Sequence, residues 1–411
     1  MSTKVGLFGL LGSGNLGNDG SLEAVLGFLA EQHPDAVVSA FCGGPEQVRE
    51  RYGIETVPLH WNQSEYETAS GVKSIAGKGF GKLVDVFRTA AWVRRQDVVI
   101  VPGMGVLEAT LPLRPWGFPY SLLLLCASGR VVGTKVALVS VGANVIGERA
   151  TRAVVKLAAG FAAYRSYRDE LSRDAMREMG VDVSRDEVYP DLAFSLPIPV
   201  DVPAAAGTVG VGVMDYHGGN TDRARADEIH EVYVAKMKQF VRRLVSDGRE
   251  VRLFTGDSAD EAVVDEILAD VQRWRPGHGG VAAARVSCLD DLMREMAAVD
   301  AVVATRFHNV LCALKLSKPT ISLGYAVKND VLMAQLGLAE FCQPVRTFEV
   351  DRLIGQLATL ERQGPEVRET MTMRNAEAAA RLRHQFSVLT GSIFPNSTVP
   401  KSSTAEREEA R

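Results

Sequence analysis

The sequence predicts an α/β protein with two doubly wound domains, each built on a parallel sheet, that face each other across a cleft. Three observations predict this fold. Short apolar runs of strand length alternate with helical patterns along most of the chain, as in parallel sheets covered by helices on both faces. The length of 411 residues exceeds that of one compact core. The alternation also pauses at residues 198–207, a predicted linker with several prolines and alanines, and then restarts.

The first array of elements starts at the N-terminus. Residues 4–11 are an apolar run that predicts a strand, and residues 19–32 carry apolar side chains at helical spacing. Further elements follow in the same alternation: a strand at 36–41, a helix near 45–52, and strands at 97–101 and 135–141.

The second array starts directly after the linker. Residues 208–214 predict a strand, and residues 224–247 predict a long amphipathic helix that Gly248 ends. Further predicted strands lie at 251–254, 284–286, 301–303 and 320–323, and predicted terminal helices at 348–386. The resulting division is an N-terminal Rossmann-like domain (1–200), a C-terminal Rossmann-like domain (201–345), C-terminal helices (346–394) and a disordered tail (395–411).

Composition and charge exclude several classes of protein. The net charge of −4 and the pI of about 6.1 argue against a general nucleic-acid partner. The five cysteines include no CxxC pair, which predicts a reducing, cytoplasmic compartment without disulfides. The short apolar run at residues 5–11 leads into a glycine-rich loop and does not resemble a signal peptide. We find no P-loop and no metal-binding motif, so neither a metal nor a cofactor is expected.

The apolar segment around residues 122–126 is too short to span a bilayer. With Trp116, Phe118 and Tyr120 it forms either a buried core helix or a surface for peripheral membrane contact, and the first interpretation is favoured. The oligomeric state cannot be read from the sequence.

The first strand leads into a glycine-rich loop that ends at Asp19. Glycines at the carboxyl end of a strand let the backbone approach a ligand, and the following helix presents free N–H groups. Asp19 is interpreted either as the N-cap of that helix or as a site residue. A nicotinamide-binding loop is disfavoured because residues 41–44, after the second strand, lack the expected acidic side chain.

The segment 164–169 places Arg168 and Asp169 between a predicted strand end and a helix start. Arg168 either points into the cleft or forms a surface salt bridge, and Asp169 is expected to cap the next helix. The segment 255–257 reads as a simple turn, and His217 lies in a glycine-containing stretch that forms a candidate flap without a chemical role.

Three cationic or titratable candidates follow the strands of the second array. Arg306 and His308 come directly after residues 301–303, and Lys328 follows residues 320–323. Ligands bind at the carboxyl edge of such sheets, so these side chains predict a site for an anionic substrate. The alternatives are a helix-capping turn with a packed His308 and a solvated Lys328.

Together these segments resemble the polysaccharide pyruvyl transferase family. The resemblance rests on four motifs spread from about residue 6 to residue 337: Gly14-Asn15-Leu16-Gly17-Asn18-Asp19, Ser166-Tyr167-Arg168-Asp169-Glu170-Leu171-Ser172 with Pro190-Asp191-Leu192-Ala193-Phe194, Thr305-Arg306-Phe307-His308, and Tyr325-Ala326-Val327-Lys328. Each motif alone is weak, but their order and spacing are specific. The chain departs from the family pattern at Met104, which interrupts a glycine run, at Leu192, which replaces a proline, and at Asn18, which lengthens the first loop.

The resemblance implies a GT-B-like fold, with the acceptor on the N-terminal domain and the donor on the C-terminal domain. It implies phosphoenolpyruvate as the donor and a sugar of a glycan or glycolipid as the acceptor, joined as a pyruvate ketal. The enzyme would work in the cytoplasm, including at the inner face of the membrane. The acceptor sugar and the ketal stereochemistry are not specified.

Roles for individual residues follow as a hypothesis. Donor binding is assigned to Arg168, Arg306, His308 and Lys328, and substrate binding more generally to Gly14, Asn15, Gly17, Asn18 and Tyr325. The expected catalytic residues are His308 as the acid, Asp19 as a base or hydroxyl anchor, and Arg306. The competing hypotheses are a nucleotide-sugar glycosyltransferase of the same fold and a non-catalytic glycan-binding protein. Acceptor contacts are expected in the loops at 61–78 and 111–119.

Overall fold

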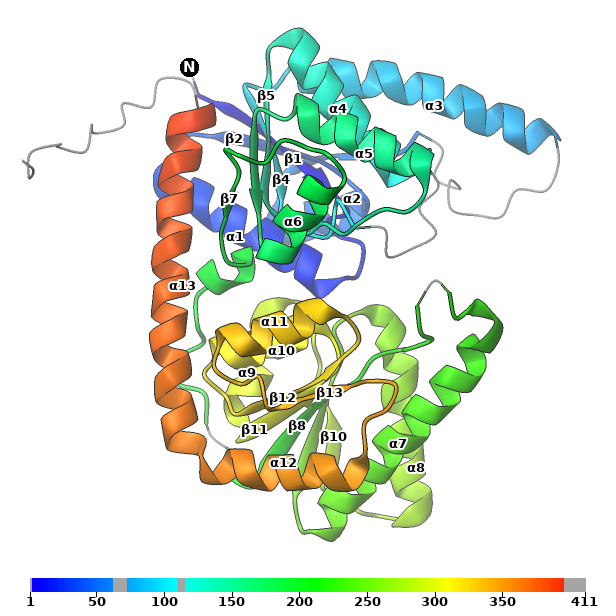
Figure 1. Ribbon diagram of the computed structural model, residues 1–411, viewed down its shortest axis with the longest axis vertical. Coiled ribbons are helices and arrows are strands. Elements are labelled where there is room, and N and C mark those ends of the chain that lie inside the picture. The colour runs from blue at the N-terminus through cyan, green and yellow to red at the C-terminus, as the bar shows by residue number, and fades with distance from the viewer. Residues whose placement is uncertain (1, 62–71, 109–114, 204, 220, 395–411) are drawn as a thin grey trace, which may run out of the picture.

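The computed structural model describes residues 2–61, 72–108, 115–203, 205–219 and 221–394, with the side chains of 72–78 left out. The chain forms two domains stacked one above the other, each with a parallel sheet between helices (Figure 1). The expected tail at 395–411 and large parts of the two expected acceptor loops lie outside the described residues.

The sheet of the N-terminal domain has seven parallel strands in the order β3-β2-β1-β4-β5-β6-β7. Its strands are β1 (Lys4–Gly9), β2 (Val37–Cys42), β3 (Glu55–Pro58), β4 (Val98–Pro102), β5 (Lys135–Val141), β6 (Tyr164–Tyr167) and β7 (Glu187–Val188). Its helices are α1 (Leu16–Gln32), α2 (Pro45–Tyr52), α3 (Val72–Val93), α4 (Phe118–Val132), α5 (Arg149–Phe161), α6 (Glu170–Glu178) and the short 3₁₀ turn η1 (Leu192–Ser195). β4 is buried along its whole length, as expected for a central strand covered on both faces.

The sheet of the C-terminal domain repeats this arrangement with six parallel strands in the order β10-β9-β8-β11-β12-β13. Its strands are β8 (Thr208–Gly212), β9 (Glu250–Phe254), β10 (Val281–Ala283), β11 (Ala301–Ala304), β12 (Thr320–Gly324) and β13 (Cys342–Pro344). Its helices are α7 (Ala226–Ser246), α8 (Glu261–Trp274), α9 (Leu289–Ala298), α10 (Phe307–Lys315) and α11 (Val327–Gln335), with the short turns η2 (Arg223–Arg225) and η3 (Ser258–Asp260). Both sheets reverse their strand order beside their first strand, the place where ligands bind in doubly wound folds.

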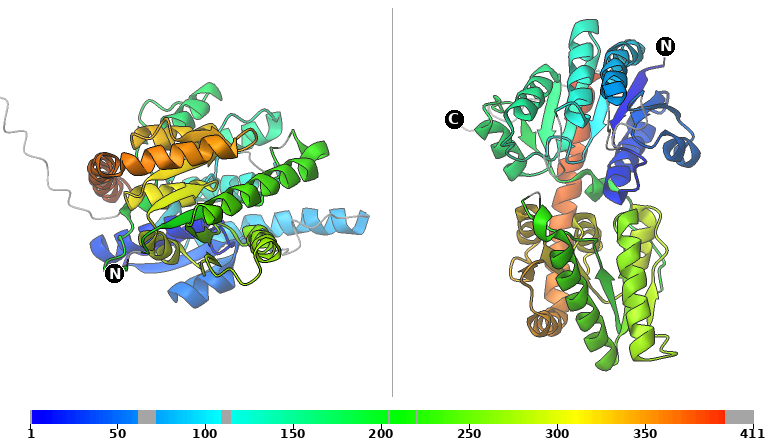
Figure 2. Two further views of the ribbon diagram at one scale, coloured as in Figure 1. Left: turned by 90° about the horizontal axis from the view of Figure 1, so that it is seen from below. Right: turned by 90° about the vertical axis from the view of Figure 1, so that its right-hand side faces the viewer.

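Two C-terminal helices, α12 (Val350–Arg362) and α13 (Gly364–Ile393), complete the chain. α13 runs along both domains (Figure 2). Gln385 donates to Ser140 and Ser166 in the N-terminal domain, each at 2.9 Å, and Asn375 donates to the carbonyl of Leu314 in the C-terminal domain at 2.9 Å. This helix therefore ties the domains together on the side away from α3.

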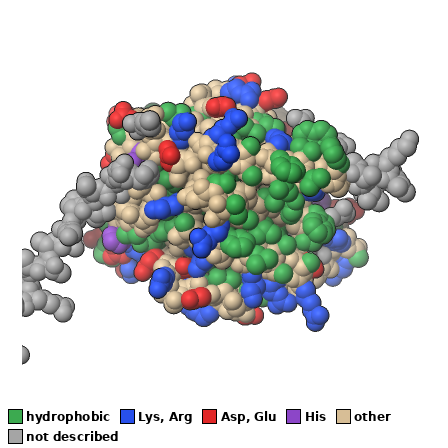
Figure 3. All heavy atoms as spheres, turned by 90° about the horizontal axis from the view of Figure 1, so that it is seen from above, with side chains coloured by type: hydrophobic (Ala, Val, Ile, Leu, Met, Phe, Trp, Pro, Cys, Tyr) green, Lys and Arg blue, Asp and Glu red, His purple; other side chains and the backbone are tan. Residues whose placement is uncertain are grey.

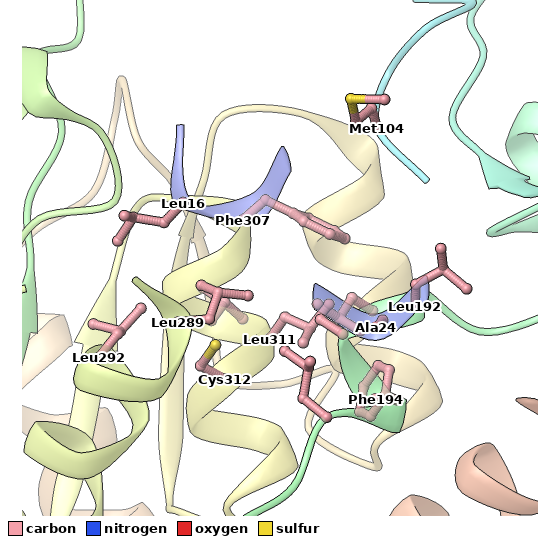
Figure 4. Packing of buried hydrophobic residues seen from close by; sticks show 14 of the residues in the cluster. Leu16, Ala24, Met104, Leu192, Phe194, Leu289, Leu292, Phe307, Leu311 and Cys312 are labelled. Atoms are coloured by element: carbon pink, nitrogen blue, oxygen red, sulfur yellow. The ribbon is translucent and has the colours of Figure 1, made fainter. Parts of the chain in front are cut away.

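The domains also meet through apolar packing between α1 and η1 on one side and α9 and α10 on the other (Figure 4). Gly20 of α1 lies so close to Leu289 of α9 that a Cβ there would collide with the leucine side chain. A glycine at this position lets the two helices approach.

Most predicted elements exist, with small shifts at their ends. The exception is the strand predicted at residues 284–286, which was wrong: the strand is β10, three residues earlier. β10 is an edge strand that pairs with β9. The position of such a short strand in the chain depends on its pairing register rather than on its own apolar content. The helix predicted from residue 19 begins at Leu16, because Asn15 caps it.

Candidate active site

The candidate site lies where turns from the carboxyl ends of both sheets meet. The segments after β4, β6 and β7 of the N-terminal domain contact those after β11 and β12 of the C-terminal domain. The site therefore depends on both domains.

Glu108, in the turn after β4, joins two cations that come from different domains. Its Oε1 accepts a hydrogen bond from Arg168 Nη2, and its Oε2 lies 3.1 Å from Lys328 Nζ. Glu108 is 9% exposed and Arg168 7% exposed, whereas Lys328 keeps 19% of its side chain exposed, so the first two members of this ion triad are buried. Burial raises the pKa of Glu108, but Arg168 and Lys328 outweigh it and hold the pKa below the usual range.

Two aspartates complete the surroundings of Arg168. Asp191 Oδ2 lies 3.6 Å from Arg168 Nη1, and Asp169 Oδ2 lies 3.7 Å from its Nε. Asp169 also caps α6 by accepting from Ser172 N at 2.7 Å, as predicted. The interpretation of Arg168 as a surface salt bridge was wrong, because the side chain is buried among three carboxylates and its carbon Cζ lies 5.0 Å from the ring centroid of Phe307.

Lys328 is not the freely solvated lysine of the alternative interpretation. Its ammonium pairs with Glu108 and lies 5.5 Å from the ring centroid of Phe307 and 5.6 Å from that of Tyr325. Two aromatic faces and a carboxylate therefore fix the position of the charge.

His308, in the first turn of α10, faces the same cluster. Its Nε2 lies 4.0 Å from Asp191 Oδ2. Burial lowers the pKa of His308 to about 4; Asp191 opposes this effect, while Arg168 and Lys328 reinforce it. The ring is therefore neutral at pH 7 in this arrangement.

The N-terminus of α1 packs directly on His308. A Cβ at Gly17 would collide with the imidazole ring, so only glycine permits this contact. Of the glycine-rich loop, Gly17 thus lies at the cluster, whereas Gly14 lies beside Ser258 of the C-terminal domain.

Asn15 and Asn18, the other predicted substrate-binding residues of the glycine-rich loop, form hydrogen bonds within the protein. Asn15 Oδ1 accepts from the backbone of Gly17 and Asn18, and its Nδ2 donates to Asp257 at 3.2 Å, linking the two domains. Asn18 donates to the carbonyl of Leu10 at 3.2 Å. These contacts stabilise the loop itself, and roles in substrate binding stay predictions.

Asp19 is not the N-cap of α1, so that interpretation was wrong. The carboxylate lies one turn into the helix and accepts from the backbone N–H of Gly12 at 2.7 Å, closing the loop in front of the helix. Asp19 is 9% exposed, and burial raises its pKa despite the Gly12 hydrogen bond and the charge of Arg51. The raised pKa makes the Asp19 carboxylate a stronger base than a solvent-exposed aspartate.

Arg306 is separated from the other cations by its partner. Asp260 accepts from Arg306 Nε at 2.9 Å and from Nη2 at 2.5 Å, and it also accepts the backbone N–H groups of Asp215 and Gly256. Arg306 keeps 19% of its side chain exposed. The structure therefore brings together Arg168, His308 and Lys328, while Arg306 lies in a neighbouring salt bridge.

An open hollow of about 320 Å³, counting its mouth, lies against the cluster. Its lining comes from both domains and comprises Arg168, Asp169, Pro190, Asp191, Phe194, Phe307, Lys328, Val331, Leu332 and Gln335.

Three residues of the site were missed from the sequence: Glu108, Asp191 as a partner of Arg168, and Asp260. Acidic side chains of this kind are scattered along the chain, and only the pairing of distant turns distinguishes them. A sequence signal existed for Glu108 alone, because it follows the glycine-containing turn after a buried strand.

Comparison with known proteins identifies a family for most of the chain. The family model described as "Polysaccharide pyruvyl transferase" matches residues 15–326, most of the chain. A search of curated proteins returned no match.

Several solved structures share the fold at low sequence identity. The putative UDP-N-acetylglucosamine 2-epimerase of Listeria monocytogenes aligns with a TM-score of 0.63 at 11% identity, over 97% of this chain and 99% of that one. The HepE protein of Anabaena, in complex with UDP and glucose, gives 0.57 at 14% identity, over 95% and 100%. The UDP-GlcNAc 2-epimerase of Neisseria meningitidis, bound to UDP-GlcNAc, gives 0.56 at 10% identity, over 95% and 100%. At these identities the likeness shows the fold alone: two facing Rossmann-like domains of the GT-B type.

Proposed function

The chain belongs to the polysaccharide pyruvyl transferase family, and from that premise we propose that it transfers the pyruvyl group of phosphoenolpyruvate to a sugar of a glycan or glycolipid, forming a pyruvate ketal. The donor needs cations for both its carboxylate and its phosphate. The acceptor needs two hydroxyl groups and a group that can take up a proton.

The observation that carries this proposal is the convergence of Arg168 and Lys328, from opposite domains, on one carboxylate of the protein. Glu108 holds the two cations as a substrate carboxylate would hold them. We propose that phosphoenolpyruvate displaces Glu108 from Arg168 and Lys328, so that the donor itself joins the two domains. The partly exposed Arg306 is assigned to the phosphate.

His308 is proposed to become an acid only when the donor is bound. Burial and two neighbouring cations lower its pKa, and an incoming dianionic phosphate would raise that pKa by favouring the imidazolium. Protonation of the ring is thereby coupled to the presence of substrate. This coupling would prevent a buried charge from persisting without a partner.

The proposed reaction balances as follows. A proton adds to the methylene carbon of phosphoenolpyruvate, C2 becomes electrophilic, and the first sugar hydroxyl attacks it and releases its proton. The C2–O bond to phosphate breaks, and the second hydroxyl attacks C2 and releases its proton. One of the two released protons replaces the one that went to the methylene carbon, and the other leaves with phosphate. Asp19 is proposed as a proton acceptor on the acceptor side.

The proposal is tested by thermal unfolding with phosphoenolpyruvate and, in parallel, with uridine and guanosine diphosphate sugars. A ligand at 100 times its dissociation constant adds about 2.7 kcal/mol. We expect that gain with phosphoenolpyruvate for wild type and its loss for Lys328→Met and Arg306→Ala. Lys238→Met is the matched control, because Lys238 pairs with Glu266 away from the site. A gain with a nucleotide sugar alone would support the glycosyltransferase alternative and contradict the proposal.

Turnover is measured as acceptor-dependent release of phosphate from phosphoenolpyruvate. We expect His308→Ala to lower turnover by roughly 10²–10⁴-fold, whereas His384→Ala, at an exposed position on α13, leaves it unchanged. Unchanged turnover in a folded His308→Ala enzyme would remove His308 from the mechanism.

A surface on the N-terminal domain supports an acceptor presented at the cytoplasmic face of a membrane. Phe80, Leu83 and Phe87 lie at helical spacing on α3 and are 59%, 56% and 69% exposed, and Trp116 nearby in the fold is 63% exposed. Figure 3 shows hydrophobic side chains gathered on this side of the molecule with lysines and arginines at their border. Within the described residues, each helix is too short or too polar to cross a bilayer.

We therefore propose peripheral contact through α3 with anionic lipid. Sedimentation with phosphatidylglycerol-containing vesicles tests this contact: wild type should bind and Phe80→Ser/Phe87→Ser should not. Equal sedimentation of the two proteins would contradict it.

A further inference from the structure

Three potential metal ligands come together at the carboxyl end of β8, outside the cluster around Glu108. Asp215 and His217 lie in the segment between β8 and α7, and His230 lies in α7 itself. Asp215 Oδ1 lies 3.0 Å from His217 Nε2 and 3.1 Å from His230 Nδ1. The three ligand atoms all lie within 4.8 Å of one another.

These distances suit a single small cation. Zinc binds imidazole nitrogen and carboxylate oxygen at about 2.0–2.2 Å, which puts two ligand atoms of a tetrahedral site roughly 3.3–3.5 Å apart. The contacts of Asp215 Oδ1 are near that spacing, so a slight outward movement of the two rings would accommodate the ion. The set of two histidines and one carboxylate favours a divalent transition metal over magnesium or calcium, which prefer oxygen ligands.

Hydrogen bonds do not satisfy every polar atom of this cluster. His230 Nδ1 is buried and makes no hydrogen bond within the described structure, although Asp215 Oδ1 is only 3.1 Å away. The rings of His217 and His230 stack with centroids 4.5 Å apart and an angle of 10° between their planes. A buried imidazole nitrogen that faces a carboxylate without a hydrogen bond is a costly arrangement, and a metal ion that takes up the nitrogen lone pair would remove that cost.

The site has a structural connection to the candidate active site. The backbone N–H of Asp215 donates to Asp260 Oδ1 at 2.9 Å, and Asp260 is the carboxylate that holds Arg306. The backbone N–H of Gly219 donates to Asp222 at 2.7 Å, and Arg346 lies 2.9 Å from the same carboxylate. The loop between β8 and α7, which extends toward the N-terminal domain (Figure 1), is thus anchored at several points.

We propose that Asp215, His217 and His230 form a binding site for a divalent transition metal, zinc being the closest fit, that fixes the loop after β8. The three protein ligands leave a fourth position for water. Through Asp215 and Asp260 the metal would hold the turn that carries Arg306. The site has no part in the transfer chemistry proposed above.

The experiment uses the full chain, treated with chelator and dialysed, and titrated with Co²⁺ and then with Zn²⁺. We expect wild type to bind one Co²⁺ with the visible d–d absorption of a four-coordinate nitrogen and oxygen site, and Zn²⁺ to displace it. His230→Ala and His217→Ala should weaken binding by more than about 100-fold, since removing a ligand costs at least as much as removing its supporting partner. Metal should also raise the unfolding temperature of wild type.

His278→Ala is the matched control, because His278 directly precedes the edge strand β10, at the amino ends of the parallel strands, whereas the proposed site lies at the carboxyl end of β8. It should bind metal as wild type does. The proposal is overturned if wild type takes up no metal, or if His217→Ala and His230→Ala bind it as tightly as wild type and His278→Ala do. Neither outcome depends on phosphoenolpyruvate turnover, so this test is independent of the proposed function.

Discussion

Asp260 and Glu108 are both buried carboxylates that neutralise a cation of the candidate site, yet their surroundings differ. Asp260 is fully buried and accepts two backbone N–H groups in addition to the fork of Arg306. The hydrogen bonds that the Glu108 carboxylate accepts within the described residues come from two side-chain cations, Arg168 and Lys328, of opposite domains. Backbone N–H groups are held in place by the fold, whereas side-chain cations can turn to another partner. Asp260 is therefore expected to be a fixed part of the fold, whereas under the proposed function Glu108 is the partner whose place a substrate carboxylate would take.

The largest effect that sharpens this comparison is expected for Asp260→Asn. The substitution leaves Arg306 without its charge partner and points an amide NH2 at one of the two backbone donors, so unfolding should become easier by about 3–5 kcal/mol. Urea unfolding followed by circular dichroism measures it, with Asp174→Asn on an exposed ion pair as the control. Phosphoenolpyruvate should not restore the lost stability. Restoration would mean that Asp260, like Glu108, is exchangeable.

The second effect concerns His308 and pH. Its pKa in the fold is lowered to about 4, below the ordinary value of about 6.5, so between these values the unfolded chain binds more protons. The neutral ring makes its full contribution to the free energy of unfolding above about pH 6.5. That contribution, up to about 3 kcal/mol, is lost as the pH falls to 4.

The measurement compares urea midpoints at pH 7 and pH 4.5 for wild type and His308→Asn, and the variant should lose less stability on acidification. Equal losses would show that the ring titrates normally in the fold.

The third effect tests the exchange of partners directly. Glu108→Gln removes the carboxylate that competes with the donor for Arg168 and Lys328, so phosphoenolpyruvate should bind about tenfold more tightly, or about 1.4 kcal/mol. The protein without ligand should be less stable than wild type, because two cations lose a partner. Calorimetric titration measures the affinity. Weaker binding by the variant would mean that Glu108 orients the donor rather than competes with it.

The smallest expected effect is the uptake of a proton when the donor binds. If a bound phosphate raises the pKa of His308, binding at pH 7 should take up as much as about one proton per donor molecule. Calorimetry in buffers of different ionisation enthalpy measures this uptake, and His308→Asn should abolish it. An uptake that persists in the variant would assign the proton to another group, with Asp19 as the next candidate.

The alternating pattern of the sequence predicted the two parallel sheets and their order of elements correctly, because a strand buried on both faces must be apolar throughout. The pattern was less informative about the edge strands of the sheets and about the caps of the helices. Residues 284–286 were predicted as a strand that pairing places at β10, and Asp19 was one candidate for the cap of α1 although Asn15 provides it. The position of β10 is decided by its pairing with β9, which is distant in sequence. The cap of α1 is decided by which of two similar side chains reaches the free N–H groups of Gly17 and Asn18.

The sequence by itself determined the fold class, the turns that follow the strands, and the residue types Arg168, Arg306, His308 and Lys328 at those turns. Only the tertiary structure decided which of them meet. It grouped Arg168, His308 and Lys328 around Glu108, gave Arg306 to Asp260, and placed His230 beside Asp215. The physical reason is that charge pairing acts over a few ångströms in space, while the partners stand 46 to 220 residues apart in the chain for the ion pairs of Arg306 and Lys328. A local sequence pattern cannot identify partners that far apart in the chain.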